Sequence, residues 1–352
     1  MADFQYSYHL PPELIAKRPA RPRDAARLLV YDTASDVISF DAFLNIGRYL
    51  PKHALLVLND TKVVPARVAL KKETGGKIEA LFLLNEWRQR GPIPALLDRK
   101  AVLGANLGFR PVGRKTAGGR FQVVRQSENI FWLQPDFPPS KIFKLLGRQG
   151  TTPIPKYIKG SGLTEKELRK EYQAVFAKNS ASVAAPTASL HFTDRLLRKL
   201  SRQGIRRAFI TLDVGLGTFA PVSAEQMAKG ELHREFFSIQ PASEVLIKEY
   251  RAEGKPIVAV GTTVVRALES RHPVSPTRGD GVSTKLFIRP PFRFKAVDAL
   301  ITNFHLPESS LMMLVQALLE QKVARRTLVE LYQIAINEKF RFYSFGDAML
   351  II

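Results

Sequence analysis

The stretch Pro256-Ile-Val-Ala-Val-Gly-Thr-Thr-Val-Val-Arg-Ala-Leu-Glu269 changes character at Gly261. Before the glycine it is a short apolar run, typical of a buried strand, and after it Val265 and Leu268 recur at helical spacing. Strands that lead through a short loop into a helix are the units of parallel sheets. Ligands bind such sheets at the carboxyl ends of the strands. This stretch therefore predicts an α/β fold with a site near Gly261.

A further strand and a second strand–loop–helix unit support this prediction. Residues 209–214, Phe-Ile-Thr-Leu-Asp-Val, form an apolar strand pattern, and residues 298–302 form another that precedes a helical pattern. The apolar positions of that helix are Leu311, Leu314, Val315 and Leu318. Two strand–loop–helix units and a further apolar strand predict a mainly parallel sheet with helices packed on it.

Capping patterns mark two more helices. Thr164 followed by Glu167 is a capping box, and Thr193 is a suitable N-cap for a helix that ends near Gly204. The first of these helices is expected to present one apolar face, made of Leu168, Tyr172, Val175 and Phe176. The second is expected to bury Leu196, Leu197 and Leu200.

Residues 66–149 have a different texture. Short apolar or alternating runs, such as 77–84 and 130–133, are separated by glycine-containing turns and show little helical periodicity. This pattern predicts a small β-barrel or sandwich. The sequence therefore predicts a discontinuous α/β domain, residues 1–65 and 150–352, that is interrupted by an inserted β-barrel domain at 66–149.

The composition restricts the class of protein. Of 352 residues, 45% are hydrophobic and 24% are charged, which fits a globular chain rather than a disordered one. The absence of cysteine excludes disulfides and thiolate metal sites. No run of about eighteen apolar residues occurs, and the N-terminus lacks a secretory pattern. A cytoplasmic protein without a membrane segment is expected.

The net charge of +21, from 53 basic and 32 acidic residues, suggests a polyanionic partner, because each neutralised phosphate adds affinity through counterion release. A generally basic proteome is the alternative explanation. The basic residues recur inside segments that look folded, namely 71–72, 110–115, 198–207 and 322–326. This distribution favours a basic surface on an enzyme over a disordered nucleic-acid arm.

Two loops that follow predicted strands are rich in small residues. The backbone N–H groups of Gly261, Thr262 and Thr263 open a helix and are suited to hold a carboxylate or phosphate. An ordinary capped helix start explains the same three residues.

The second loop, Gly-Leu-Gly-Thr-Phe-Ala at 215–220, matches G-x-G-x-x-A, and Glu235 lies near the spacing of a dinucleotide site. The Pro221 that follows and the short helical stretch at 224–229 argue against such a site, because neither suits a crossover helix. Close backbone approach to another ligand, or a plain loop, explains the glycines better.

Two histidines follow segments of small or polar residues. His191 ends Val-Ala-Ala-Pro-Thr-Ala-Ser-Leu-His, and His305 follows Asn303 directly after a predicted strand. A lone histidine is more often structural than catalytic. Metal-dependent and serine-hydrolase chemistry are poorly supported, since the sequence contains neither H-E-x-x-H nor G-x-S-x-G.

Several longer segments of the sequence can be compared with the sequences of known families. They are residues 8–11, 58–67 (LNDTKVVPAR), 153–158 (PIPKYI), 172–177, 182–188 (SVAAPTA), 214–219, 260–263, 298–307 (DALITNFHLP) and 341–350 (RFYSFGDAML). In these segments, and in their order, the chain resembles the S-adenosylmethionine:tRNA ribosyltransferase-isomerases of queuosine biosynthesis over essentially its whole length.

The resemblance implies an α/β domain interrupted by a β-barrel. It also implies a tRNA that carries 7-aminomethyl-7-deazaguanine at the wobble position, with S-adenosylmethionine as co-substrate. The ribosyl part of the donor is transferred and isomerised, giving epoxyqueuosine with release of adenine and methionine. No metal or redox cofactor is implied, and we expect a monomer.

This chemistry requires a base to remove a proton beside the sulfonium and an acid to protonate the departing adenine. The catalytic candidates are His191, Glu235, Asp213 and His305. The residues expected to hold the donor are Thr187, Gly215, Gly217, Thr218, Gly261, Thr262, Thr263 and Asn303. The residues expected to contact tRNA are Arg67, Lys71, Lys72 and Arg110.

Three positions depart from the family pattern. Asp213 stands where the family usually has histidine, Ser189 replaces a glycine, and Lys156 replaces a proline. Two alternatives therefore remain. A divergent, non-catalytic RNA-binding protein on the same scaffold would release no adenine, and a conventional methyltransferase would yield S-adenosylhomocysteine.

Overall fold

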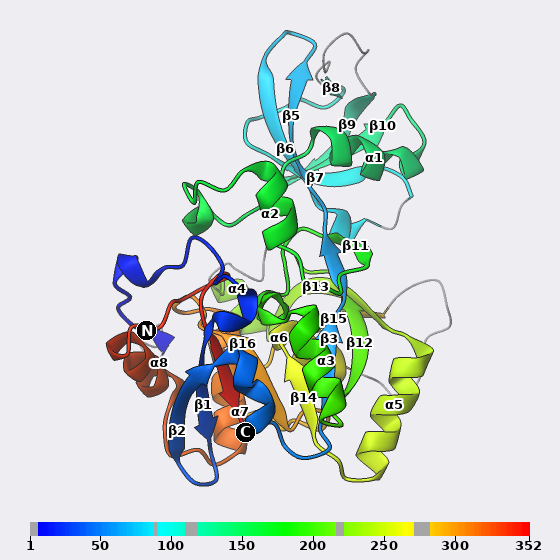
Figure 1. Ribbon diagram of the computed structural model, residues 1–352. Helices are drawn as coiled ribbons and strands as arrows, with labels where there is room; N and C mark the ends of the chain where they lie inside the picture. Colours follow the sequence, from blue (N-terminus) through cyan, green and yellow to red (C-terminus); the bar gives the residue numbers. More distant parts are fainter. Residues whose placement is uncertain (1–5, 88–89, 110–118, 216–221, 271–281) are drawn as a thin grey trace.

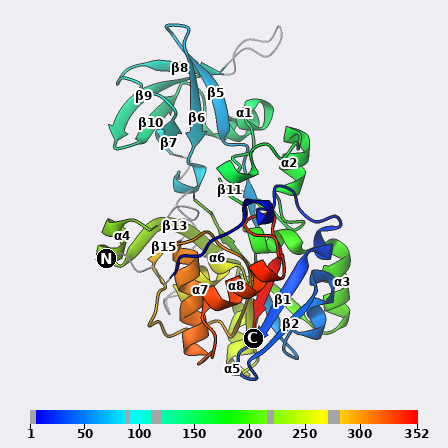
Figure 2. The same cartoon turned by 90° about the vertical axis from the view of Figure 1, so that its left-hand side faces the viewer.

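The computed structural model describes residues 6–87, 90–109, 119–215, 222–270 and 282–352. Within them the chain forms a nine-stranded sheet domain and a closed barrel of six strands. The barrel lies at one end of the sheet domain, with α2 between them (Figures 1 and 2).

The centre of the large sheet is parallel. It consists of β12 (Arg206–Leu212), β3 (Leu55–Asn59), β14 (Ile257–Val260) and β16 (Ala299–Asn303), in that order. Because these four strands run the same way, their carboxyl ends lie along one edge. β14 and β16 confirm the strands predicted at residues 256–260 and 298–302.

Strands at both margins make the whole sheet mixed. β13 (Glu231–Ile239) and β15 (Val282–Leu286) continue it beyond β12, and both pairings are antiparallel. At the other margin lie β17 (Ala348–Ile351), β1 (Arg27–Asp32) and β2 (Val37–Ala42). The prediction of a mainly parallel sheet therefore describes the four central strands, and four of the eight pairings are antiparallel.

Helices cover both faces of the sheet. Leu55 and Val57 of β3 belong to a core shared with α5 (Pro241–Ala252), α6 (Thr262–Glu269), α7 (Ser310–Gln321) and α8 (Leu328–Asn337). The alternate residues Leu56 and Leu58 pack against α3 (Asp194–Arg202) on the opposite face. This alternation follows from the two-residue period of a strand, and it gives three layers.

The predicted capping box of α2 (Glu165–Glu171) is confirmed, since Thr164 and Glu167 cap each other reciprocally. The predicted apolar face is wrong beyond Tyr172, because the helix ends at Glu171. The Gln173 side chain pairs instead with the backbone of Val63, donating to its carbonyl at 2.7 Å and accepting from its N–H at 3.0 Å. Val175 is consequently 42% exposed.

The barrel lies within the predicted insertion. Its strands are β5 (Arg67–Lys72), β6 (Lys77–Phe82), β7 (Ile93–Leu97), β8 (Asn106–Phe109), β9 (Arg120–Ser127) and β10 (Ile130–Pro135). All neighbours pair antiparallel, and β9 with β10 closes the ring. α1 (Ile142–Gln149) packs Ile142, Leu145 and Leu146 onto the barrel core.

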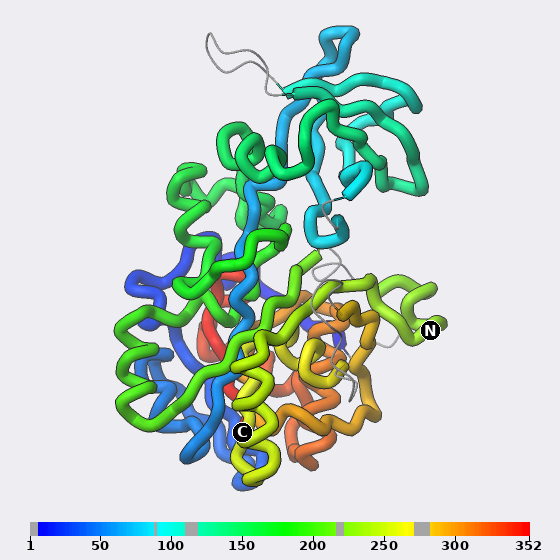
Figure 3. The backbone as a smooth tube through the Cα atoms, turned by 90° about the vertical axis from the view of Figure 1, so that its right-hand side faces the viewer, coloured from blue at the N-terminus to red at the C-terminus, as the bar shows by residue number. Residues whose placement is uncertain are grey.

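The chain enters and leaves the barrel side by side (Figure 3). Thr151 donates to the Arg67 carbonyl at 2.8 Å, and the Arg67 N–H donates back at 3.2 Å. Just below, β4 (Thr61–Val63) pairs with β11 (Asn179–Ser182). These contacts join the barrel to the sheet domain. A short helix, α4 (Ala224–Lys229), precedes β13. None of the helices in the described ranges has the length and apolar character needed to cross a membrane.

The junction generates a prediction about Gly150. A Cβ atom at this position would lie 1.8 Å from the Pro65 carbonyl oxygen, whereas a Cβ on Gly147 of α1 would meet nothing within 4 Å. Gly150→Ala should therefore lower the free energy of unfolding by about 3 kcal/mol. The control Gly147→Ala should be neutral or stabilise by up to about 1 kcal/mol, because alanine is the better helix former. Urea denaturation checks both values, and equal effects of the two variants would contradict the close approach.

Candidate active site

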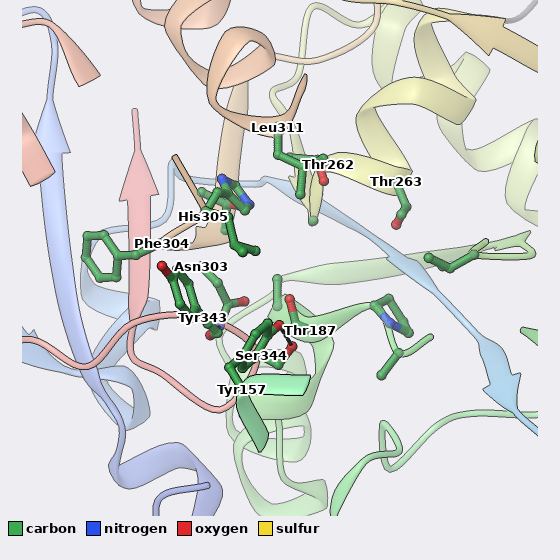
Figure 4. A pocket seen from close by; sticks show the side chains of 17 residues that line it. Tyr157, Thr187, Thr262, Thr263, Asn303, Phe304, His305, Leu311, Tyr343 and Ser344 are labelled. Atoms are coloured by element: carbon green, nitrogen blue, oxygen red, sulfur yellow. Dashed lines mark hydrogen bonds between the residues drawn. The ribbon is translucent and has the colours of Figure 1, made fainter. Parts of the chain in front are cut away.

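A pocket lies at the carboxyl edge of the parallel strands. We call it the carboxyl-edge pocket. Its polar lining comprises Tyr157, Thr187, Thr262, Thr263, Thr302, Asn303, His305, Tyr343 and Ser344. Tyr157, Thr187 and Ser344 lie together on one side of it, opposite Thr262 and Leu311 (Figure 4). The pocket is therefore at the place that the strand–loop–helix units predicted.

The Asn59 side chain holds three elements at this edge. Its Oδ1 accepts from the backbone N–H groups of Leu212 and Thr61, both at 3.1 Å. Its Nδ2 donates to the Leu212 carbonyl at 3.0 Å and to Thr263 Oγ1 at 3.3 Å. Asn59 is fully buried, so one amide ties the end of β3 to the end of β12 and to the start of α6.

Gly261 shapes the turn from β14 into α6. Its φ of 94° is a conformation that side chains other than glycine rarely adopt. The turn places Thr262 and Thr263 at the first positions of α6, where both are buried and line the pocket. The first N–H groups of a helix have no partner within it, so this edge is suited to acceptor atoms of a ligand.

His305 is the catalytic candidate that lines this pocket. Its Nε2 lies 3.1 Å from Thr302 Oγ1, and its Nδ1 lies 3.4 Å from Tyr332 Oη. Burial lowers the pKa of His305 to about 3, because desolvation disfavours the imidazolium. The ring is therefore neutral at physiological pH, and two hydroxyl groups fix its orientation.

His191 lies behind the pocket lining rather than in it. It ends the short helical turn η8 (Thr187–His191), and its ring packs 5.0 Å from that of Phe43. Its Nε2 is 3.3 Å from Asn303 Nδ2, which also donates to the Tyr343 carbonyl at 3.2 Å. Burial lowers the pKa of His191 to about 4. His191 thus helps to orient Asn303, whose buried Oδ1 has no hydrogen-bond partner among the described residues.

Glu235 and Asp213 lie outside the carboxyl-edge pocket. Glu235 forms a buried ion pair with Arg266 and accepts from the Gly215 N–H at 3.3 Å. Both Glu235 and Gly215 line a second pocket. Asp213 is half-buried and accepts from Thr61 Oγ1 at 3.1 Å. Gly217 and Thr218, also predicted to hold the donor, lie outside the described residues.

A third and wider pocket opens between the barrel and the sheet domain. On the barrel side it is lined by Arg67, which forms an ion pair of 2.6 Å with Glu79. Its lining shares Tyr157 and Leu306 with the carboxyl-edge pocket. Lys71 and Lys72 lie further along β5, and Arg110 is outside the described residues.

The sequence analysis missed the aromatic side of the site. The Tyr157 hydroxyl lies 2.7 Å from Ser344 Oγ, and the rings of Tyr157 and Tyr343 are 4.9 Å apart. These residues belong to the segments 153–158 and 341–350, which carried the resemblance but received no role. No group of three or more metal-ligating side chains occurs in the described part of the chain.

A polar pocket at the carboxyl ends of parallel strands, with a wider pocket beside it under the barrel, is typical of an α/β enzyme. Comparison with known proteins identifies the particular family. Residues 3–351 match the model of the queuosine biosynthesis proteins, and the chain belongs to that family.

Full-length relatives support this assignment. The chain is 42% identical to the S-adenosylmethionine:tRNA ribosyltransferase-isomerase of Moorella thermoacetica and 41% identical to that of Thermotoga maritima. Each comparison covers 99% of this chain and 99% of the relative. It also matches the crystal structure of a Thermotoga maritima S-adenosylmethionine tRNA ribosyltransferase, with a TM-score of 0.52 and 32% identity. That match covers 99% of this chain and 100% of the other. The predicted family and fold class are confirmed.

The two buried histidines predict acid sensitivity of the fold. Their folded pKa values lie below the value of about 6.5 expected for the unfolded chain. As the pH falls below about 6.5, the unfolded state binds protons that the folded state does not, so the free energy of unfolding decreases. Each histidine makes the free energy of unfolding fall by up to about 1.4 kcal/mol for each pH unit below about 6.5. This contribution ends near the pKa of that histidine in the folded protein.

Urea denaturation between about pH 5.5 and 4.5 measures this slope. His305→Gln should reduce it by about 1.4 kcal/mol per pH unit relative to the unchanged protein. The control His53→Gln, which alters an exposed histidine, should leave the slope as it is. An unchanged slope in His305→Gln would mean that His305 is not held neutral by burial.

Proposed function

We propose that this chain catalyses the reaction for which its relatives are named. The ribosyl part of S-adenosylmethionine is transferred to 7-aminomethyl-7-deazaguanine in tRNA and isomerised to an epoxycyclopentanediol, with release of adenine and methionine. Family membership over residues 3–351 supports this assignment. So does a full-length identity of about 42% with named ribosyltransferase-isomerases.

One structural observation supports the proposal most directly. The carboxyl-edge pocket is suited to a small ligand, and it adjoins the wide pocket under the barrel through Tyr157 and Leu306. A donor nucleoside in the first pocket and a tRNA base in the second would therefore meet at a shared wall. A reaction between a free nucleoside derivative and a polymer requires such an arrangement.

The donor's adenosine is assigned to the carboxyl-edge pocket. Thr262 and Thr263 present hydroxyl and backbone donors at the start of α6, and the buried Oδ1 of Asn303 offers an unused acceptor. The rings of Tyr157 and Tyr343 supply an aromatic wall. Together these groups suit a molecule with a flat base and ribose hydroxyl groups.

Proton transfer is assigned to His305, which of the four catalytic candidates is the one lining this pocket. The sulfonium acidifies the neighbouring C5′–H, and removal of this proton opens the ribose toward an unsaturated sulfonium and expels adenine. The aminomethyl nitrogen then attacks, and methionine leaves as the epoxide closes. A neutral imidazole can accept a proton in the first step and return it to adenine. His191 is assigned the positioning of Asn303, and no metal or redox cofactor is proposed.

The substitution of Asp213 for the usual histidine does not favour a non-catalytic protein. The side chain is hydrogen-bonded to Thr61 Oγ1 beside the Asn59 network, and the strand ends around it are intact. We propose that the chain acts as a monomer in the cytoplasm.

The products of the reaction test the proposal. Purified protein with S-adenosylmethionine and tRNA carrying 7-aminomethyl-7-deazaguanine should release adenine and methionine in step with modified tRNA. Unmodified tRNA lacks the attacking amine and should yield neither. His305→Gln should lower kcat by about 10² to 10⁴, while His191→Gln should cost less because it acts through Asn303. Formation of S-adenosylhomocysteine would contradict the proposal and establish a methyltransferase.

The salt dependence of tRNA binding tests the role of the barrel. Each phosphate contact contributes about 0.7 to 0.9 to the slope of log affinity against log salt concentration. Replacing Lys71 and Lys72 of β5 by alanine should therefore lower the slope by about 1 to 2. Replacing Lys248 of α5 and Lys255, three residues beyond that helix, removes the same charge and should change the slope less, because α5 lies away from the barrel (Figure 1). Equal changes in the two double variants would contradict a binding surface on the barrel.

A further inference from the structure

The second pocket contains features that the proposed reaction has not yet used. We call it the Arg266 pocket. It lies beside the carboxyl-edge pocket, because Leu311 lines both and because Val214 lines one while the adjacent Gly215 lines the other. Its polar lining comes from the start of α7, from α6 and β13, and from the short turn η5 (Leu84–Glu86) of the barrel domain.

Two buried polar atoms in this lining have no hydrogen-bond partner in the part of the chain that the structure describes. Arg266 is 5% exposed; its Nε donates to the Leu286 carbonyl at 3.1 Å and its Nη1 to Glu235. Its Nη2 has no hydrogen-bond partner among the described residues, and the same holds for Oδ1 of Asn85, which is 4% exposed. Buried polar groups in native proteins are normally hydrogen-bonded. An unused donor and an unused acceptor therefore line one pocket.

The charges around these atoms identify the kind of ligand. Arg266 offers a donor to an anion, but Glu235 already balances its charge, and Glu86 adds a carboxylate at the exposed side of the pocket. Two carboxylates would repel a phosphate of RNA. A zwitterion suits the lining better, since its carboxylate can accept from Arg266 and its ammonium can donate to Asn85 Oδ1 and Glu86.

The spacing along α6 connects this pocket to the donor. Arg266 follows Thr262 by four residues and Thr263 by three, and residues at these separations share one face of a helix, about 5–6 Å apart. A molecule whose nucleoside contacts the two threonines can therefore extend an amino-acid chain toward Arg266.

We propose that the methionine end of S-adenosylmethionine binds in the Arg266 pocket, with its carboxylate on Arg266 and its ammonium on Asn85 and Glu86. This inference rests on the proposed function, because it assumes that S-adenosylmethionine is the donor. The donor then spans both pockets, and its ribose lies at their junction beside Leu311.

Two ligands that differ in the amino-acid end test the inference. S-adenosylhomocysteine carries the α-carboxylate and α-ammonium, whereas 5′-methylthioadenosine has the same adenosine without them. Isothermal titration of the full-length protein should show tighter binding of S-adenosylhomocysteine. Asn85→Leu and Glu86→Gln should each weaken S-adenosylhomocysteine binding about tenfold or more and leave 5′-methylthioadenosine binding within about twofold. Asn106→Leu makes the same chemical change as Asn85→Leu, elsewhere in the barrel, and should affect neither ligand.

The possible failures are distinguishable. This inference would be overturned if the variants bound both ligands equally more weakly, or if both variants bound S-adenosylhomocysteine as tightly as the unchanged protein. Either result would leave the proposed function standing. Failure of the unchanged protein to bind either ligand would overturn the proposed function and the inference with it. Glu86 is on the exposed side of the pocket, so Glu86→Gln keeps the test valid if Asn85→Leu does not fold. The retained binding of 5′-methylthioadenosine confirms that a variant is folded.

Discussion

The buried amide of Asn59 is the contact on which the active-site edge depends. Neighbouring parallel strands pair along their length, but their ends would otherwise be free to separate. One side chain satisfies the backbone of β12 in both directions and reaches Thr263 at the start of α6. Since the carboxyl-edge pocket is built from the residues that follow these strand ends, its shape follows from this hydrogen-bonding pattern.

The inserted barrel contributes to the site through its position rather than through its own core. Its ends are tied together by the Arg67–Thr151 bridge and by the close approach of Gly150 to Pro65. These contacts hold the barrel over the strand ends, so that Arg67 lines one neighbouring pocket and Asn85 the other. A small-molecule site thereby acquires walls from a second domain.

Much of the fold follows from local sequence patterns, because strand–loop–helix units and capping boxes are local signals. The placement of the marginal strands does not, since β17 pairs in parallel with β1 across more than 300 residues, and no local pattern encodes so distant a pairing. The residues of the site likewise divide into those that local sequence patterns predict and those that they do not. Thr262, Thr263, Asn303 and His305 could be predicted because each lies at, or within three residues of, the carboxyl end of a strand. The partnership of Glu235 with Arg266, and that of Tyr157 with Ser344, depends on tertiary packing that spacing does not encode.

The central claim is that the donor binds at the carboxyl edge of the parallel strands. A crystal structure of the protein with S-adenosylhomocysteine tests it most directly. The account predicts adenosine against Thr262, Thr263 and Asn303, with the ribose beside Leu311. Adenosine bound instead in the wide pocket between Arg67 and Lys156, or outside these pockets, would contradict the account.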